Sequence, residues 1–344
     1  MTRWYEQAEA DKGVIISSRI RLARNLKNHP FPGRMNETAA SGVIEEIKDS
    51  VINERTAAAN IFVYEELSGK PREYLQELLE RHIISPEMAA KTTKRGLLLS
   101  GDESVSVMIN EEDHARIQAI YAGDEIDTAY STADKIDNLI EESANYAFDP
   151  EFGYLTACPT NTGTGMRASF MLHIPALEQT GNLQGFVQAV SKFGIAVRGI
   201  HGEGSESAGS IYQISNQTTL GKPENDIIAT LKNVTKQIIE QEEMLRDKIL
   251  TDLKTATEDR IYRAYGILKN SRILRLQEAM AMLSDVRVGY IWGILDPSAK
   301  PKMTIYNLMM EIQHGSIAKR LGRQVDEGEC DVFRAEFVRG VFGG

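Results

Sequence analysis

The spacing of hydrophobic and polar positions changes once along the chain, near residue 222. Before it, short β-branched runs alternate with polar residues and are separated by Gly and Pro, which is typical of strands joined by turns. After it, apolar residues recur at every third or fourth position, which is typical of amphipathic helices. We therefore predict a strand-rich domain over residues 1–222 and a helical domain over residues 223–344.

The same periodicities locate individual elements. The predicted strands cover residues 14–24, 61–64, 96–100, 104–110, 167–174, 194–200 and 210–216, although a helix stays possible for 167–174. The last two strands form a long hairpin, and the Gly-rich segment between them is either a mobile lid or an exposed tip. The predicted helices cover residues 227–250, 272–294, 304–314 and 331–339, and Ser271 is expected to cap the second of them.

Two arginines share one side of the first strand. Alternation places Arg19 and Arg21 beside Ser17 on one side, and Ser18 with Ile20 on the other. With a rise of about 3.3 Å per residue, the two guanidinium groups lie roughly 6.6 Å apart, a separation that can straddle a polyphosphate. The alternative is a half-exposed strand whose arginines are hydrated.

Two further segments gather groups that can do chemistry. Residues 110–116 read Asn-Glu-Glu-Asp-His-Ala-Arg, and three adjacent carboxylates must find partners or stay solvated. Residues 160–166 form a loop of mostly small residues whose backbone amides can approach an anion, and Arg167 follows at the start of a strand. A solvated acidic loop is the alternative for the first segment, and the Gly-x-Gly of the second is unspecific.

Other conspicuous residues are expected to be structural. His173 lies on the polar side of its strand and is interpreted as a hydrogen-bonding residue rather than a metal ligand. The methionines of the helical part are interpreted as core filler rather than a cofactor site: Met280, Met282, Met303, Met309 and Met310.

Composition and charge exclude several classes of function. The chain has 344 residues and a net charge of −10, from 39 Lys and Arg against 49 Asp and Glu, which disfavours a nucleic-acid-binding surface. No apolar run approaches the roughly 20 residues of a membrane span and no signal-peptide core is present, so we expect a cytoplasmic protein without a membrane partner. Two cysteines cannot build a disulfide framework or a four-ligand zinc site, and no Walker A motif occurs.

Four motifs together resemble the catalytic domain of guanidino (phosphagen) kinases, in the family's order and spacing. They are Ser17-Ser18-Arg19-Ile20-Arg21, Asn110-Glu111-Glu112-Asp113-His114, Cys158-Pro159-Thr160-Asn161 with Gly163-Thr164-Gly165-Met166-Arg167-Ala168, and Arg198 to Glu203 with Ile214-Ser215-Asn216. Within the family, the chain is most similar to the bacterial branch that phosphorylates arginine in proteins. The resemblance implies an α+β fold with a mainly antiparallel sheet flanked by helices, followed by a C-terminal helical domain.

The resemblance also implies roles for particular residues. It implies ATP binding by Ser17, Ser18, Arg19, Arg21, His82, Arg116, Arg167, Ser169, Arg198 and Gly199. It implies that Glu112 is the catalytic carboxylate, that Glu203 holds the substrate guanidinium, and that Cys158 lies nearby, where a merely packed thiol is the alternative. The implied cofactors are ATP and Mg²⁺, with no metal held by the protein alone.

Departures from the family pattern bear on substrate and regulation. Only sixteen residues precede Ser17, which leaves no room for the helical domain that encloses small substrates in metabolite kinases, so we expect an open acceptor site suited to a protein. Residues 217–221 lack a further phosphate-contacting Arg. The branch has an Arg-Asp-x-x-Arg-Ala motif that senses phosphoarginine, whereas this chain has Cys330 in place of the first Arg. We therefore expect Asp331 and Arg334 to form a weakened regulatory pocket or none.

The resemblance extends to the cellular setting. It implies a homodimer that marks protein clients for a Clp protease, or controls a repressor, in a stress response, with a zinc-binding activator as a further partner. The alternatives are a kinase for free arginine or another guanidino metabolite, and a catalytically weak protease adaptor.

Overall fold

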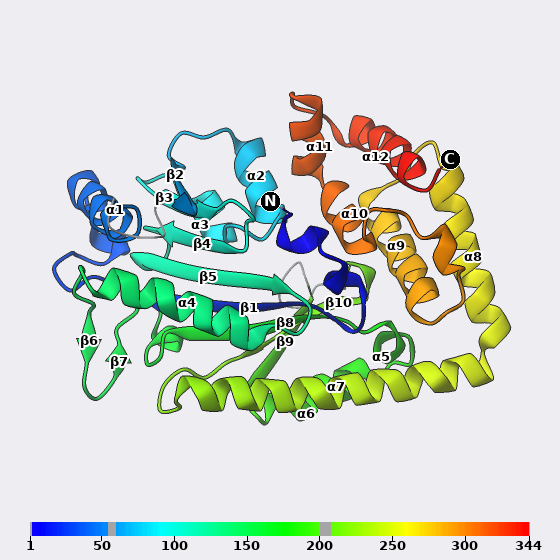
Figure 1. The fold of residues 1–344 in the computed structure, drawn as a ribbon, viewed down its shortest axis with the longest axis horizontal. Coiled ribbons are helices and arrows are strands. Elements are labelled where there is room, and N and C mark those ends of the chain that lie inside the picture. The colour runs from blue at the N-terminus through cyan, green and yellow to red at the C-terminus, as the bar shows by residue number, and fades with distance from the viewer. Residues whose placement is uncertain (1, 54–59, 200–207, 344) are drawn as a thin grey trace.

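The fold is built around one large sheet (Figure 1). The computed structural model describes residues 2–53, 60–199 and 208–343. Within them the sheet has the order β2-β3-β4-β5-β1-β8-β10-β9, and every neighbouring pair is antiparallel. Its strands are β1 (Ile15–Arg24), β2 (Phe62–Glu66), β3 (Gly96–Ser100), β4 (Val105–Ile109), β5 (Ala115–Ala122), β8 (Met166–His173), β9 (Ile195–Gly199) and β10 (Ile211–Asn216). The predicted mainly antiparallel sheet is confirmed.

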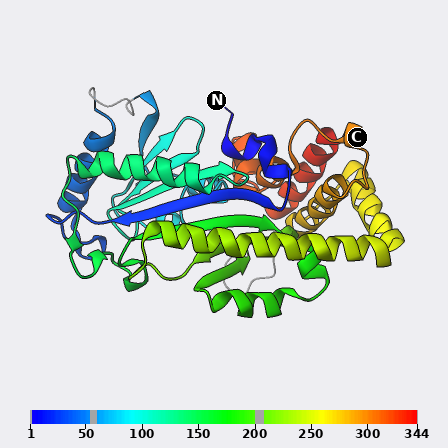
Figure 2. The same ribbon diagram turned by 60° about the horizontal axis from the view of Figure 1, so that its bottom comes forward.

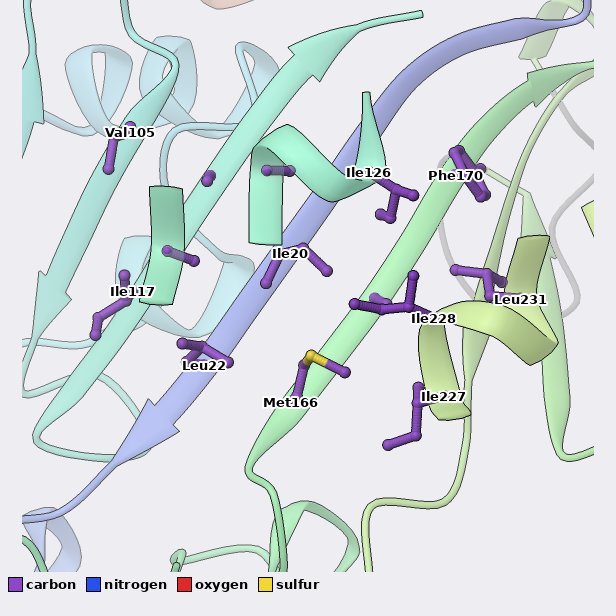
Figure 3. Close-up of a cluster of buried hydrophobic side chains, with 14 of the residues drawn as sticks. Ile20, Leu22, Val105, Ile117, Ile126, Met166, Phe170, Ile227, Ile228 and Leu231 are labelled. Carbon is purple, nitrogen blue, oxygen red and sulfur yellow. The ribbon is translucent and has the colours of Figure 1, made fainter. Parts of the chain in front are cut away.

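One face of the sheet packs against long helices (Figure 2). Helices α1 (Glu37–Val51), α4 (Ile126–Glu141) and α7 (Glu224–Asp252) share a hydrophobic core with this face. Figure 3 shows Ile20 and Leu22 of β1 among the side chains of this core. Because side chains alternate along a strand, Arg19 and Arg21 point to the opposite face. The apolar half of the β1 pattern therefore determines where its cations go.

The opposite face is covered in two places. Helices α2 (Arg72–Glu80) and α3 (Pro86–Ala90) pack near β3 and β4, through a core that includes Met88 and Met108. Two short helical turns, η1 (Trp4–Glu6) and η2 (Ala8–Asp11), pack with α9 (Leu276–Ile291) and α10 (Ile305–Glu311) against the other end. The helical C-terminal part therefore shares a core with the sheet.

A buried arginine links these parts. Arg287 of α9 is 1% exposed and donates hydrogen bonds to the Asp11 carboxylate (3.2 Å), the Ala10 carbonyl (2.8 Å) and His173 Nδ1 (2.7 Å). The other ring nitrogen of His173 lies 2.7 Å from Ser284 Oγ. The structural interpretation of His173 is confirmed, and α9 is tied to the N-terminal segment and to β8.

The remaining elements show where helix prediction succeeded and failed. They are β6 (Phe148–Asp149), β7 (Gly153–Tyr154), α5 (Pro175–Gln179), α6 (Leu183–Ser191), α8 (Lys254–Asn270), α11 (His314–Leu321) and α12 (Glu327–Val341). The predicted role of Ser271 is wrong, because this residue follows the C-terminus of α8, and α9 begins only after Arg275. Strand β8 settles the choice left open for residues 167–174. No helix among the described residues has the length and apolar character needed to cross a bilayer.

Candidate active site

Strand register brings the predicted arginines together. In the sheet Arg21 lies directly between Gln118 of β5 and Arg167 of β8. Arg116 of β5 lies opposite Ala23, two residues further along β1. Arg198 of β9 lies opposite Gln213 of β10. The five predicted arginines and His82 line one cavity of about 610 Å³ on the face away from the main core.

Burial makes this cavity strongly electropositive. Desolvation, reinforced by Arg116 and Arg167, lowers the pKa of Arg19 to about 10, and Arg21 is affected in the same direction. Arg19 donates a hydrogen bond to the Gln213 side chain. The Nε atom of Arg21 is buried and has no hydrogen-bond partner within the described part of the chain. Like charges held together out of water favour an anion as their partner.

An acidic turn borders the cationic group. Arg116 Nη2 lies 3.6 Å from a carboxylate oxygen of Glu112, and Arg116 Nη1 donates to the buried Glu111 carboxylate at 2.5 Å. Ser85 also donates a hydrogen bond to Glu111. Desolvation raises the pKa of Glu112 against the opposing effect of Arg116, and Glu87 raises it further. The Glu112 carboxylate is therefore a stronger base than a solvated one.

Three carboxylates of this region lie close enough to share a cation. Oxygen atoms of Glu87, Glu111 and Glu112 all lie within 4.8 Å of one another. Carboxylate oxygens are ligands that suit Mg²⁺. Glu111 already accepts from Arg116, so Glu112 and the exposed Glu87 offer the more available oxygens. Glu87 escaped the sequence analysis because it comes from α3, more than twenty positions before the acidic motif.

The Cys158 loop is anchored to the acidic turn. The buried Asp113 carboxylate accepts hydrogen bonds from the Asn25 side chain (2.6 Å) and the Ala157 backbone amide (2.7 Å). The second of these bonds holds Ala157, the residue before Cys158, against Asp113, the residue after Glu112. The half-buried Cys158 thiol lies 3.0 Å from Thr160 Oγ1, and Cys158 does not line the arginine cavity.

The other predicted site residues are divided between the cavity and its surroundings. Gly199 lines the cavity, whereas the buried Ser17 and Ser169 do not. Ser18 faces away: its hydroxyl donates to the Gly123 carbonyl (2.7 Å) and accepts from the Glu125 amide (2.8 Å), where it supports the turn before α4. Glu203 lies outside the described residues.

The C-terminal pair Asp331 and Arg334 is committed to internal contacts. Arg334 is 2% exposed and donates to the carbonyls of Ile312 (2.9 Å) and Leu274 (2.8 Å) and to the Asp331 carboxylate (2.5 Å). These bonds join α12 to the end of α10 and to the segment before α9. The arrangement is that of a structural anchor.

Sequence reasoning missed the polar and apolar companions of the arginines. Gln118 and Gln213 line the cavity, and Gln118 donates to the His82 carbonyl at 2.7 Å. Their position on the arginine face follows from strand alternation once the register is known. Of the methionines interpreted as core filler, Met280, Met309 and Met310 are indeed buried, but they also line the cavity.

Two family models and several protein sequences are similar to this chain. Residues 42–245 match the model of the ATP:guanido phosphotransferase C-terminal catalytic domain, and residues 254–343 match that of the protein-arginine kinase McsB C-terminal domain. The chain is 44% identical to a protein-arginine kinase of Caldanaerobacter subterraneus subsp. tengcongensis, over 95% of this chain and 96% of that protein. It is 42% identical to one of Clostridium acetobutylicum, over 98% and 99%.

A solved structure shares the fold. The duplicated taurocyamine kinase from Schistosoma mansoni, with bound transition-state-analogue components, superposes with a TM-score of 0.61 at 25% identity. The match covers 72% of this chain and 37% of the taurocyamine kinase chain.

Proposed function

Because the chain belongs to the ATP:guanido phosphotransferase family, a family of kinases, we propose that it transfers the γ-phosphoryl group of ATP to arginine side chains of proteins. The observation that carries the proposal is the convergence of five arginines from four strands on one cavity, with Glu112 at its border. The naming of its near full-length relatives as protein-arginine kinases supports a protein as acceptor.

The arginines act on the phosphates. Phosphoryl transfer passes through a loose transition state, so catalysis depends mainly on positioning and on charge compensation at the phosphoryl oxygens. In our proposal Arg19, Arg21 and Arg167 hold the triphosphate, and Arg116 compensates charge where the γ-phosphoryl group meets the acidic turn. Arg198 of β9 is the fifth arginine proposed to bind the phosphates.

The carboxylates act on the acceptor. A guanidinium has a pKa above 12, so its nitrogen is a poor nucleophile until a base accepts a proton from it. Glu112, whose pKa is raised by burial, is proposed as that base. Glu203 is proposed to hold the planar guanidinium, and Cys158, on the loop anchored through Asp113, to adjust its electrostatics.

Magnesium is part of the proposal. Mg²⁺ binds mainly through substrate phosphates and one or two carboxylates, and it neutralises charge on the transferred group. The exposed Glu87 has a carboxylate oxygen to hold it beside Arg116, which leaves Glu112 to act as the base. The marking of clients for a Clp protease, dimer formation and an activator remain expectations of the family resemblance.

The test measures acid-labile phosphate formed with Mg·ATP on casein or on free arginine. We expect label on casein, its loss in Glu112→Gln, and retention in Glu142→Gln, an exposed residue at the end of α4. Label on free arginine alone would overturn the protein substrate. No label on either acceptor, with nucleotide still bound, would favour an adaptor.

A further inference from the structure

A second cavity, the hairpin pocket, lies beside the β6–β7 hairpin and away from the arginine cavity. It has a volume of about 280 Å³ and is lined by Phe148, Phe152 and Tyr154 of the hairpin and by Leu220, which precedes α7. Figure 1 shows the hairpin at the end of the molecule opposite to the C-terminal helices. Phe148, Phe152 and Leu220 are 56%, 47% and 49% exposed. A group of exposed apolar side chains around one hollow is typical of an interaction surface.

The backbone beneath the hairpin pocket is tightly packed. Gly153 and Gly163 both line the pocket and have positive φ angles of 76° and 117°. A Cβ atom on Gly153 would lie 2.6 Å from the Gly163 carbonyl oxygen, and one on Gly163 would collide with the Thr219 carbonyl. Tyr154 and Gly163 also exchange two backbone hydrogen bonds, of 2.8 and 3.2 Å. Three chain segments therefore meet at a fixed distance, and the pocket is formed before any partner binds.

The inner aromatic ring of the pocket is also held in place. The Arg24 guanidinium lies 3.6 Å from the centroid of the Tyr154 ring and forms an ion pair with Asp137 at 2.6 Å. Phe148 meets the Tyr154 ring edge-on, with the ring centroids 5.3 Å apart. Tyr154 is thus fixed from behind, whereas Phe148 and Phe152 keep open apolar surface toward solvent.

The pocket shares its floor with the loop that follows Cys158. Gly163 comes five residues after Cys158, and the Thr219 hydroxyl lies 2.7 Å from the Thr162 carbonyl oxygen of the same loop. Five residues span at most roughly 18 Å even when fully extended. The hairpin pocket therefore lies within that distance of Cys158, a span that a short extended peptide covers.

Strand register places the acidic turn at the same end of the sheet. The first residue of β5, Ala115, pairs with Arg24 at the end of β1, and the first residue of β8, Met166, pairs with Leu22. The turn that contains Glu112 precedes β5, and the Cys158 loop precedes β8. Both segments therefore leave the sheet at the end from which the β6–β7 hairpin projects.

The rim of the hairpin pocket is mainly acidic. Glu151 and Glu224 line it, against one lysine, Lys222, among the described lining residues. Burial raises the pKa of Tyr154 against the opposing effect of Arg24, and the charges of Glu141 and Glu224 raise it further. Both carboxylates therefore act on the pocket. Aromatic walls with an acidic rim suit a polypeptide segment that has an apolar side chain and positive charge.

We propose that the hairpin pocket docks an apolar side chain of the protein substrate, a few residues along the chain from the arginine that is phosphorylated. This inference rests on the proposed function and adds a determinant of acceptor choice. Free arginine has no second group to place in the pocket, so only a peptide or protein gains affinity from it. An extended, arginine-bearing segment also brings the positive charge that matches the acidic rim.

The experiment compares two peptides as acceptors for the full chain with Mg·ATP. The first has a central Arg with a Phe five positions away on each side, and the second has Ser in place of both Phe; all other positions are Gly or Ser. We expect wild type to prefer the Phe peptide about tenfold in kcat/KM, through KM, because a phenyl ring leaves water. Phe152→Ser should remove this preference, and Glu151→Lys should raise the KM of the Phe peptide severalfold.

Phe193→Ser is the matched control, because Phe193 is a 59% exposed phenylalanine that does not line the pocket. Mg·ADP affinity within about twofold of wild type shows that each variant is folded. A wild type that does not distinguish the peptides, or a Phe152→Ser protein that still prefers the Phe peptide, would overturn the docking site. An unchanged KM in Glu151→Lys would overturn a cationic segment as its occupant.

Two other results identify a different error. A changed oligomeric state of Phe152→Ser, measured by light scattering, would overturn the proposal in favour of a second copy of the chain in the pocket. Wild-type protein that labels neither peptide nor casein would instead overturn the proposed function.

Discussion

Arg19→Met is predicted to make the nucleotide-free protein more stable and to weaken its binding of nucleotide. Burial, with Arg116 and Arg167 nearby, lowers the pKa of Arg19 to about 10. Since a free guanidinium has a pKa above 12, keeping Arg19 charged in the cavity costs about 3 kcal/mol. The methionine side chain is of similar length and uncharged, but it loses the hydrogen bond to Gln213, worth about 1 kcal/mol. The net expected gain is about 2 kcal/mol in the free energy of unfolding.

Urea unfolding with and without Mg·ADP measures both effects. Without ligand, the variant should unfold at a higher urea concentration than wild type. With Mg·ADP present, the difference in unfolding free energy between variant and wild type should become smaller or change sign. The reason is that the ligand stabilises the protein that binds it more tightly to a greater extent. Arg263→Met, at an exposed position of α8, is the control and should change stability by less than about 0.5 kcal/mol. A ligand-free Arg19→Met protein less stable than wild type would refute the argument that burying the Arg19 charge in the cavity costs stability.

Three further predictions follow from single contacts. Glu112→Gln should abolish phosphoryl transfer while Mg·ADP affinity, measured by titration, stays within about threefold; equal loss of both would remove Glu112 from the role of base. Burial raises the pKa of Glu242 to about 7. The protonated carboxyl group therefore contributes stability that is fully present below about pH 4.5 and is lost as the pH rises through 7. This contribution to the free energy of unfolding is about 3 kcal/mol. The unfolding free energy of Glu242→Gln should therefore fall less between pH 5 and 8 than that of wild type, and parallel profiles would contradict this. Arg334→Ala should cost about 3 kcal/mol in the urea unfolding free energy, because it orphans the Ile312 and Leu274 carbonyls; a change below 1 kcal/mol would show that Arg334 is not an anchor.

Local patterns were enough to place the arginines on a face, but not to bring them together. Alternation in β1 assigned Arg19 and Arg21 to the side away from the core, because Ile20 and Leu22 have to be buried. The central position of β1, between β5 and β8, depends on pairings more than ninety residues apart in sequence. No periodicity encodes such pairings, so the convergence rested on the family resemblance.

The failures have equally local reasons. Ser271 has the chemistry of a helix cap, but the chain continues extended from it and α9 begins after Arg275, which makes no side-chain cap. Ser18 belongs to a motif for which the family resemblance implies nucleotide binding, yet its hydroxyl hydrogen-bonds within the turn at Gly123 and Glu125. Periodicity predicts only that the methionines are buried, and a buried residue can also line a cavity that forms between the sheet and several helices.

The arrangement of charge explains how an acidic protein can take a polyanion. At physiological ionic strength the Debye length is about 8 Å, so the net charge of −10 is largely screened at the cavity, whereas arginines in direct contact with a phosphate are not. In the proposed function, the carboxylates around Glu112 repel a nucleotide from the acceptor side and attract a guanidinium there. Opposite charges adjoining along one sheet face therefore sort two oppositely charged substrates into neighbouring positions. Arg116 contacts Glu111 and lies near Glu112, so it marks the border between the cationic and the acidic groups. In the proposed function, the reacting atoms meet at this border.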